Sequence, residues 1–159
     1  MIEKEWLSFG HQFGYRNGIY IKEIHEDQRA PIFLQWLDCI HQLIYQFPSS
    51  FEYNMDLLLF LAHHSVSCLY GTFLFNNEKE RKNYNYQETV SIWTDVIGNI
   101  DKYINPFYDT NTETFLNVNF CPLKMRFWEE YFLKYNFSYA TSFEVENTFN
   151  KKISIKNYK

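Results

Sequence analysis

The stretch APIFLQWLDCIHQLIYQFPSS, residues 30–50, is the clearest helix signal in this 159-residue chain. Pro31 suits the first helical position, because its missing N–H would have no partner there in any case. Pro48 and the two serines after it end the pattern. Apolar residues between these limits recur at steps of three and four and form one stripe: Phe33, Trp36, Leu37, Ile40, Leu43, Ile44 and Phe47. We therefore predict an amphipathic helix that begins at Pro31 and buries one face.

Three further helices are expected along the chain. The first of these has Asn54 as a favourable N-cap and Asp56 in its first turn, where a negative charge is stabilising. The three helices are predicted to run from Asn54 towards Tyr70, from about Glu88 to Ile104, and from Pro122 to about Tyr135.

The segments between these helices are polar or irregular. We expect a loop over residues 17–30, a charged and solvated connector over 76–86, a weakly alternating stretch over 107–121 that could hold a short extended segment, and a frayed polar tail over 139–159. The prediction is a mainly α chain whose single domain covers residues 1–138.

Composition sets limits on the class of protein. Apolar residues make up 46% and aromatic residues 21% of the chain, so a disordered chain is excluded. The net charge is −4, and nucleic acid is not an expected partner because phosphate neutralisation needs a basic face. Cys39, Cys68 and Cys121 are far apart and form no Cys-x₂-Cys pair, which favours reduced, buried thiols over disulfides or a metal site.

The long apolar stretch over residues 55–75 raises the question of a membrane span. A transmembrane helix needs about 20 largely apolar residues. Asp56, His63 and His64 interrupt this one, so a buried central helix is the better interpretation. The two adjacent histidines would leave a helix about 100° apart and have no zinc-ligand spacing, so no metal and no cofactor is expected.

No catalytic motif can be found in the sequence. Cysteine-dependent phosphatases need a Cys, five residues and an Arg in a loop whose N–H groups bind phosphate. The sixth residue after each cysteine is Tyr45, Leu74 or Phe127. Patterns of the types GxSxG, GxxxxGK and HExxH are also absent, so no residue is assigned as catalytic.

The beginning of the chain, EKEWLSFGHQFGYR over residues 3–16, is unusually rich in apolar and loop-forming residues for a terminus. Arg16 follows a loop with two glycines, from which a guanidinium can reach an anion with two hydrogen bonds. Spacing alone favours a plain surface arginine over an anion site.

Several motifs together resemble the myotubularin family of phosphoinositide 3-phosphatases. EKEWLSFGHQF resembles the family's EKEWLSFGH-[Lys/Arg]-F signature, and SCLYGTFLFNNEKER is similar to its SCLFGTFLCNSE-x-R run. Further similarities follow in the family's order and cover about residues 2–135: the 30–54 run with its LDC and QFP elements, TVSIWTDV, YINPFY and MRFWEEYFLKY.

The resemblance implies the helical C-terminal half of an α/β, tyrosine-phosphatase-like domain, with the family's Cys-x₅-Arg loop expected upstream of residue 1. Cys39 then matches a structural cysteine and not the nucleophile. The family's basic residues that reach the lipid head group correspond to Gln12 and Arg16, with His11 beside them. Gln12 stands where the family has a basic residue, which changes the expected affinity for phosphate.

The leading hypothesis is part of a lipid phosphatase. Its intact form would remove the 3-phosphate from phosphatidylinositol 3-phosphate or 3,5-bisphosphate without a metal, while this chain alone would be inactive. By family resemblance it would be cytoplasmic and peripheral at endosomal membranes, with homo- or hetero-oligomers of myotubularins as partners. The alternatives are a catalytically dead adaptor that binds an active family member, and a remnant that self-associates through exposed apolar surface.

Overall fold

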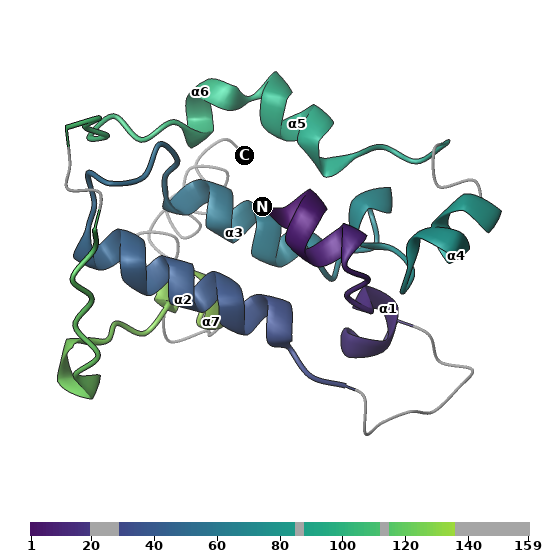
Figure 1. Ribbon diagram of the computed structural model, residues 1–159, viewed down its shortest axis with the longest axis horizontal. Helices are drawn as coiled ribbons and strands as arrows, with labels where there is room; N and C mark the ends of the chain where they lie inside the picture. Colours follow the sequence, from purple (N-terminus) through teal and green to yellow (C-terminus); the bar gives the residue numbers. More distant parts are fainter. Residues whose placement is uncertain (20–28, 85–87, 112–114, 136–159) are drawn as a thin grey trace, which may run out of the picture. The chain divides into compact units, whose positions relative to one another are not determined.

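A computed structural model describes residues 1–19, 29–84, 88–111 and 115–135 (Figure 1). The chain divides into two compact units, Met1–Arg126 and Phe127–Lys159. The described residues are mainly helical and contain no β-strand, although one isolated antiparallel bridge joins Tyr53 and Ile104. The predicted mainly α class is therefore confirmed, whereas the predicted tail over 139–159 and most of the 17–30 loop lie outside the described residues.

The helix predicted from residues 30–50 is confirmed as α2, Ile32–Gln46. Its buried positions, Phe33, Leu37, His41 and Ile44, recur at steps of four and three, as an amphipathic helix requires. This buried face packs against α3, Met55–His64, which returns beside it in the opposite direction (Figure 1).

Helix α3 begins where the sequence predicts and ends earlier. The Asn54 side-chain oxygen accepts hydrogen bonds from the backbone N–H groups of Asp56 and Leu57 at 3.1 and 3.3 Å, which is an N-cap. The helix ends at His64 rather than near Tyr70. The Ser65 hydroxyl donates to the Ala62 carbonyl at 2.9 Å, and Cys68 has a φ of 59°, which an α-helix cannot accommodate.

The third predicted helix is two short helices, α5, Ile92–Gly98, and α6, Ile100–Tyr103. The start shifts from Glu88 to Ile92 because Ser91 acts as N-cap, its hydroxyl accepting from the Trp93 N–H at 3.3 Å. Asn99 has a φ of −124° and interrupts the helical hydrogen bonds between the two. Helix α6 packs against α3 (Figure 1).

The predicted charged and solvated connector over 76–86 is largely exposed in its described part, but it is helical. Helix α4, Glu78–Asn83, occupies it, with Asn77 as N-cap accepting from the Glu80 N–H at 2.9 Å. Arg81 is only 5% exposed, and its Nε donates to the Leu74 carbonyl at 3.1 Å. The exposed charged residues of this segment agree with the prediction, and the buried Arg81 departs from it.

The predicted fourth helix is also largely wrong. Only a single 3₁₀ turn, η5, Pro122–Lys124, and the short helix α7, Glu129–Phe132, form within it. The backbone N–H of Arg126 donates to the Gln42 side chain at 2.9 Å instead of to a carbonyl of its own segment, so the helix does not propagate beyond the turn. In the second unit, the ring of Trp128 lies 5.3 Å from that of Tyr131.

Two smaller expectations concern the cysteines and the membrane span. All three cysteines are free but exposed, so the prediction of buried thiols is wrong. Cys39 lies on the face of α2 opposite its buried stripe, and Cys68 and Cys121 lie in loops. No described helix is long and apolar enough to span a membrane.

The core of the first unit is an aromatic cluster. Phe13, Phe33 and Phe73 are almost completely buried, and their ring centroids are 5.1 to 5.4 Å apart. Trp6 extends the cluster, with its ring 5.0 Å from that of Phe33. The unusual aromatic content near the chain's beginning is thus used to fix the first two helices against α2.

Candidate functional site

The candidate site is built on the first seventeen residues. A seven-residue π-helix, η1, Ile2–Ser8, is followed by a turn and by α1, Phe13–Arg16. Gly10 makes the turn with a φ of +80°, a conformation that side chains with a Cβ rarely adopt. The His11 N–H donates to the Trp6 carbonyl at 2.8 Å, which closes the turn and sets the His11 side chain beside Trp6.

Three residues predicted from the family signature come together in this part of the fold. His11, Gln12 and Arg16 line one hollow of about 360 Å³, whose remaining lining is Glu5, Trp6, Phe9, Gly10 and Ile32. Gln12 is exposed, while His11 and Arg16 are partly buried. Arg16 is the last residue of α1 and its N–H donates to the Gln12 carbonyl at 2.9 Å, so the two side chains belong to one turn of backbone.

The surroundings of His11 favour its neutral form. Burial lowers the pKa of its imidazole, and the positive charge of Arg16 lowers it further. The ring lies edge-on to Trp6 and to Phe13, with centroid distances of 4.8 and 4.7 Å. Its buried Nε2 makes no hydrogen bond to any other described residue. Because Nε2 is itself buried, it is not open to a ligand in the hollow, although the His11 residue lines it.

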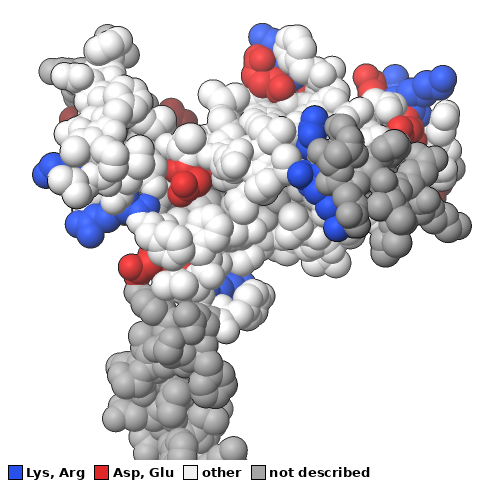
Figure 2. Space-filling model, turned by 90° about the horizontal axis from the view of Figure 1, so that it is seen from below, with Lys and Arg blue, Asp and Glu red and all other residues white. Residues whose placement is uncertain are grey.

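The charges around the hollow are mixed. Arg16 contributes a guanidinium and Glu5 a carboxylate, and Glu5 also pairs with Lys4 at 3.5 Å on the exposed side. On the face shown in Figure 2, Lys and Arg side chains form small separate groups between uncharged areas and do not make one broad basic surface. Arg16 and Glu5 are the charged residues that line the hollow, so anion binding there depends on a few placed groups.

Two asparagines outside the hollow position α1, and the sequence analysis missed both. Asn76 is 3% exposed, and its side-chain oxygen accepts from the Tyr15 N–H at 2.9 Å. The Asn17 side chain donates to the Ser65 carbonyl at 2.8 Å. The sequence could have pointed to Asn76, because this residue stands just before the N-cap of α4. There the backbone N–H of Asn76 donates to the Glu80 carboxylate at 3.0 Å. Glu5, Trp6 and Ile32 were also missed as lining residues.

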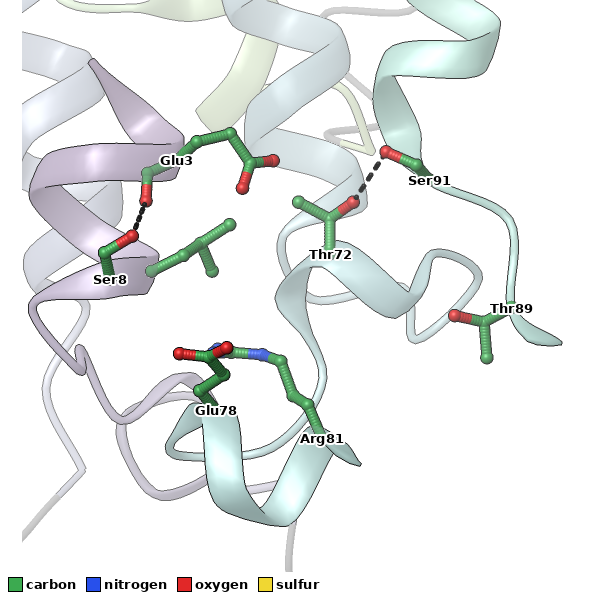
Figure 3. A pocket seen from close by; sticks show the side chains of 8 residues that line it. Glu3, Ser8, Thr72, Glu78, Arg81, Thr89 and Ser91 are labelled. Atoms are coloured by element: carbon green, nitrogen blue, oxygen red, sulfur yellow. Dashed lines mark hydrogen bonds between the residues drawn. The ribbon is translucent and has the colours of Figure 1, made fainter. Parts of the chain in front are cut away.

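A second hollow, of about 510 Å³, lies between η1, α4 and the segment before α5 (Figure 3). Its polar groups largely serve the fold. The Ser8 hydroxyl donates to the Glu3 carbonyl at 2.9 Å, and the Thr72 hydroxyl accepts from the Ile92 N–H at 3.1 Å and lies 3.4 Å from the Ser91 hydroxyl. Figure 3 shows Glu78 and Arg81 of α4 side by side at one end of this hollow.

Neither hollow has a catalytic constellation. Among the described residues no three His, Cys, Asp or Glu side chains are grouped to hold a metal ion. The reactive Cys-x₅-Arg pattern does not occur anywhere in the 159 residues. The first hollow has the features of a small anion-contacting surface, with one guanidinium, one amide and one neutral imidazole, and lacks a nucleophile.

Comparison with known proteins identifies the family of proteins to which this chain belongs. The family model for the myotubularin-like phosphatase domain matches residues 1–82, a range that includes the whole hollow. The chain therefore belongs to the myotubularin-like phosphatase family.

Individual relatives agree with this assignment. The chain is 37% identical over 137 residues to the phosphatidylinositol-3,5-bisphosphate 3-phosphatase MTMR2 of Mus musculus, a match that covers 86% of this chain and 21% of that protein. MTMR2 of Bos taurus gives the same identity and coverage. Myotubularin of Rattus norvegicus is also 37% identical over 137 residues, and 23% of its length is covered. The chain thus spans about one-fifth of the length of these relatives.

Proposed function

We propose that this chain provides part of the lipid head-group site of a phosphoinositide 3-phosphatase. The site would act on phosphatidylinositol 3-phosphate or 3,5-bisphosphate, at the cytoplasmic surface of endosomal membranes. The single observation that carries the proposal is the meeting of His11, Gln12 and Arg16 in one hollow within the family-matched region. The names of the MTMR2 relatives support the choice of substrate class.

Each of the three residues has a distinct role in this proposal. Arg16 supplies a charge-assisted contact to a phosphate, worth about 1.5–3 kcal/mol, whereas the neutral amide of Gln12 supplies about 0.5–1.5 kcal/mol. His11 lines the hollow beside Arg16 and responds to the charge bound there, while its Nε2 is itself buried. Glu5 lies in the same hollow and opposes a phosphate, which favours binding of one phosphate group over a dense cluster of them.

The chemistry of phosphate release is assigned to groups outside this chain. A thiolate nucleophile in a Cys-x₅-Arg loop is required for a cysteinyl-phosphate intermediate, and the chain has no such loop. We therefore expect no phosphate release when the 159-residue chain alone is mixed with phosphatidylinositol 3-phosphate. Turnover by the chain alone would contradict this division of roles.

Head-group binding tests the proposal directly. Soluble inositol 1,3-bisphosphate is titrated into the chain by calorimetry, and Arg16→Gln is expected to weaken binding about tenfold or more. Arg29→Gln is the matched control, because Arg29 is an exposed arginine outside the hollow and its substitution removes the same charge. Gln12→Lys, which restores a basic residue, is expected to strengthen binding about tenfold. Equal effects of Arg16→Gln and Arg29→Gln would contradict the proposal.

The second candidate function is an adaptor that pairs with an active family member. It is favoured by large exposed apolar side chains in the first unit, such as Phe107 at 74% exposure. The two candidates are separated by the coding sequence upstream of residue 1. An in-frame Cys-x₅-Arg would favour an active phosphatase, the same loop without its Cys an adaptor, and a true start codon at Met1 a short gene product.

A further inference from the structure

The segment over residues 115–126 combines high exposure with apolar side chains. Leu123 is 91% exposed, Phe115 and Phe120 are each 77% exposed, and Met125 is 52% exposed. We call residues 120–125 the 120–125 loop; the 3₁₀ turn η5, Pro122–Lys124, forms its apex. In Figure 1 this loop lies near the C-terminal end of α2, whereas α1 lies near the other end.

The loop is held in this exposed position by two glutamines of α2. The Gln46 side chain accepts from the Asn119 N–H at 2.9 Å and donates to the Asn119 carbonyl at 3.2 Å. Gln42, one turn earlier, makes the same pair of bonds to Arg126, at 2.9 and 2.6 Å. Both ends of the loop are therefore fixed through its backbone, and its apolar side chains project outward instead of folding onto the core.

The charge of this segment differs from that of the whole chain. Residues 115–126 contain Lys124 and Arg126 and no acidic residue, although the chain has a net charge of −4. Arg126 is fixed beside Tyr45, with its Nε donating to the phenol oxygen at 2.7 Å and its guanidinium carbon 4.9 Å from the ring centroid. Lys124 is exposed at the apex next to Leu123.

Exposed aromatic and aliphatic tips beside basic groups fit a particular kind of surface. Apolar side chains of this kind enter the boundary between lipid head groups and acyl chains, and lysine or arginine beside them binds anionic lipid. The core of a protein–protein interface is enriched in aromatic residues, methionine and arginine but depleted of lysine. The exposed Lys124 at the apex of the 120–125 loop is therefore the feature that favours a lipid bilayer over a protein partner.

We propose that the 120–125 loop docks on an anionic bilayer, with Phe120 and Leu123 in the head-group layer and Lys124 against lipid phosphates. This inference rests on the proposed function in one respect, because a phosphoinositide substrate lies in such a bilayer. The loop and the hollow share no residue, so the two proposals can be tested separately.

Flotation with vesicles that contain no phosphoinositide tests the loop. The 159-residue chain is mixed with vesicles of phosphatidylcholine or of phosphatidylcholine with about one-fifth phosphatidylserine, and bound protein rises with the lipid while aggregates sink. The wild-type chain is expected to float with the anionic vesicles. Leu123→Ser should reduce binding about tenfold and Lys124→Glu about fivefold. Ile97→Ser is the matched control, since Ile97 on α5 is 70% exposed and lies outside the segment.

Several results would overturn the proposal. The first is a wild-type chain that has a helical circular-dichroism spectrum but does not float with the anionic vesicles. The second is flotation of Leu123→Ser and Lys124→Glu at the wild-type level. The third is a loss of flotation in Ile97→Ser as large as in Leu123→Ser. Analytical ultracentrifugation of Leu123→Ser provides a further test, because conversion of a dimer to a monomer with unchanged flotation would assign the loop to contact between copies. Loss of flotation in Leu123→Ser with unchanged binding of soluble head group supports the bilayer assignment.

Discussion

The cluster around Phe13 and the segment over 115–126 are both rich in apolar side chains, yet they are held in opposite ways. Phe13 is fully buried and makes close ring contacts with Phe33 and Phe73. Phe120 is 77% exposed, and its segment is fixed by hydrogen bonds from glutamines. Apolar composition alone therefore does not indicate burial in this protein, because the backbone of one segment is secured by packing and that of the other by polar side chains.

The largest expected difference between the two regions is in stability. Phe13→Ala is predicted to lower the free energy of unfolding by about 3–5 kcal/mol, because it removes a fully buried ring and leaves a cavity. Phe120→Ala should change it by less than about 0.5 kcal/mol. Urea unfolding of both variants measures the contrast, and comparable losses would show that Phe120 is buried in solution.

The second test concerns the polar anchors of the segment. Gln42→Ala and Gln46→Ala remove the side chains that bond to Arg126 and Asn119, at a net cost of about 1 kcal/mol for each hydrogen bond. Amide hydrogen exchange at Asn119 and Arg126 should become faster by about fivefold or more. Gln35→Ala, at an exposed position of the same helix, is the control. Unchanged exchange would mean that something else holds the segment.

The third test concerns a polar contact within the first unit, between Tyr70 and Asp95. The Tyr70 phenol donates to the Asp95 carboxylate, and this bond raises the pKa of Tyr70 to about 12 from an ordinary value of 10.0. The folded state thus favours the neutral phenol. Its stabilisation is complete below about pH 10 and is lost as the pH rises through about 12.

Tyr70→Phe tests this contact, because a phenylalanine cannot ionise. The variant should be about 1–3 kcal/mol less stable near neutral pH and should lose less stability than the wild type on going to about pH 11. Urea midpoints across that pH range measure the difference. Parallel pH curves for the two proteins would contradict the assignment, and other tyrosines of raised pKa, such as Tyr103, would then account for the alkaline loss.

Sequence reasoning succeeded where a single local signal decides the structure. The apolar stripe of α2 and the Asn54 cap of α3 are such signals. It failed where distant side chains compete with the local pattern, as when Gln42 binds the Arg126 backbone and stops a helix 84 residues away in the sequence. Neither the spacing of Arg16 nor that of His11 indicated a shared hollow. The family signature drew attention to both residues, whereas only the three-dimensional structure shows that Glu5 lines the same hollow.

The central claim is that the η1–α1 hollow receives a phosphorylated inositol, and the His11 ring is its most direct reporter. Nitrogen NMR of the imidazole is recorded while inositol 1,3-bisphosphate is added to the 159-residue chain and to Arg16→Gln. The account predicts a saturable shift of the His11 nitrogens and a rise in the His11 pKa as phosphate offsets the charge of Arg16, with both changes strongly weakened in Arg16→Gln. Head-group binding that leaves the His11 resonances unchanged, or that persists undiminished in Arg16→Gln, would contradict it.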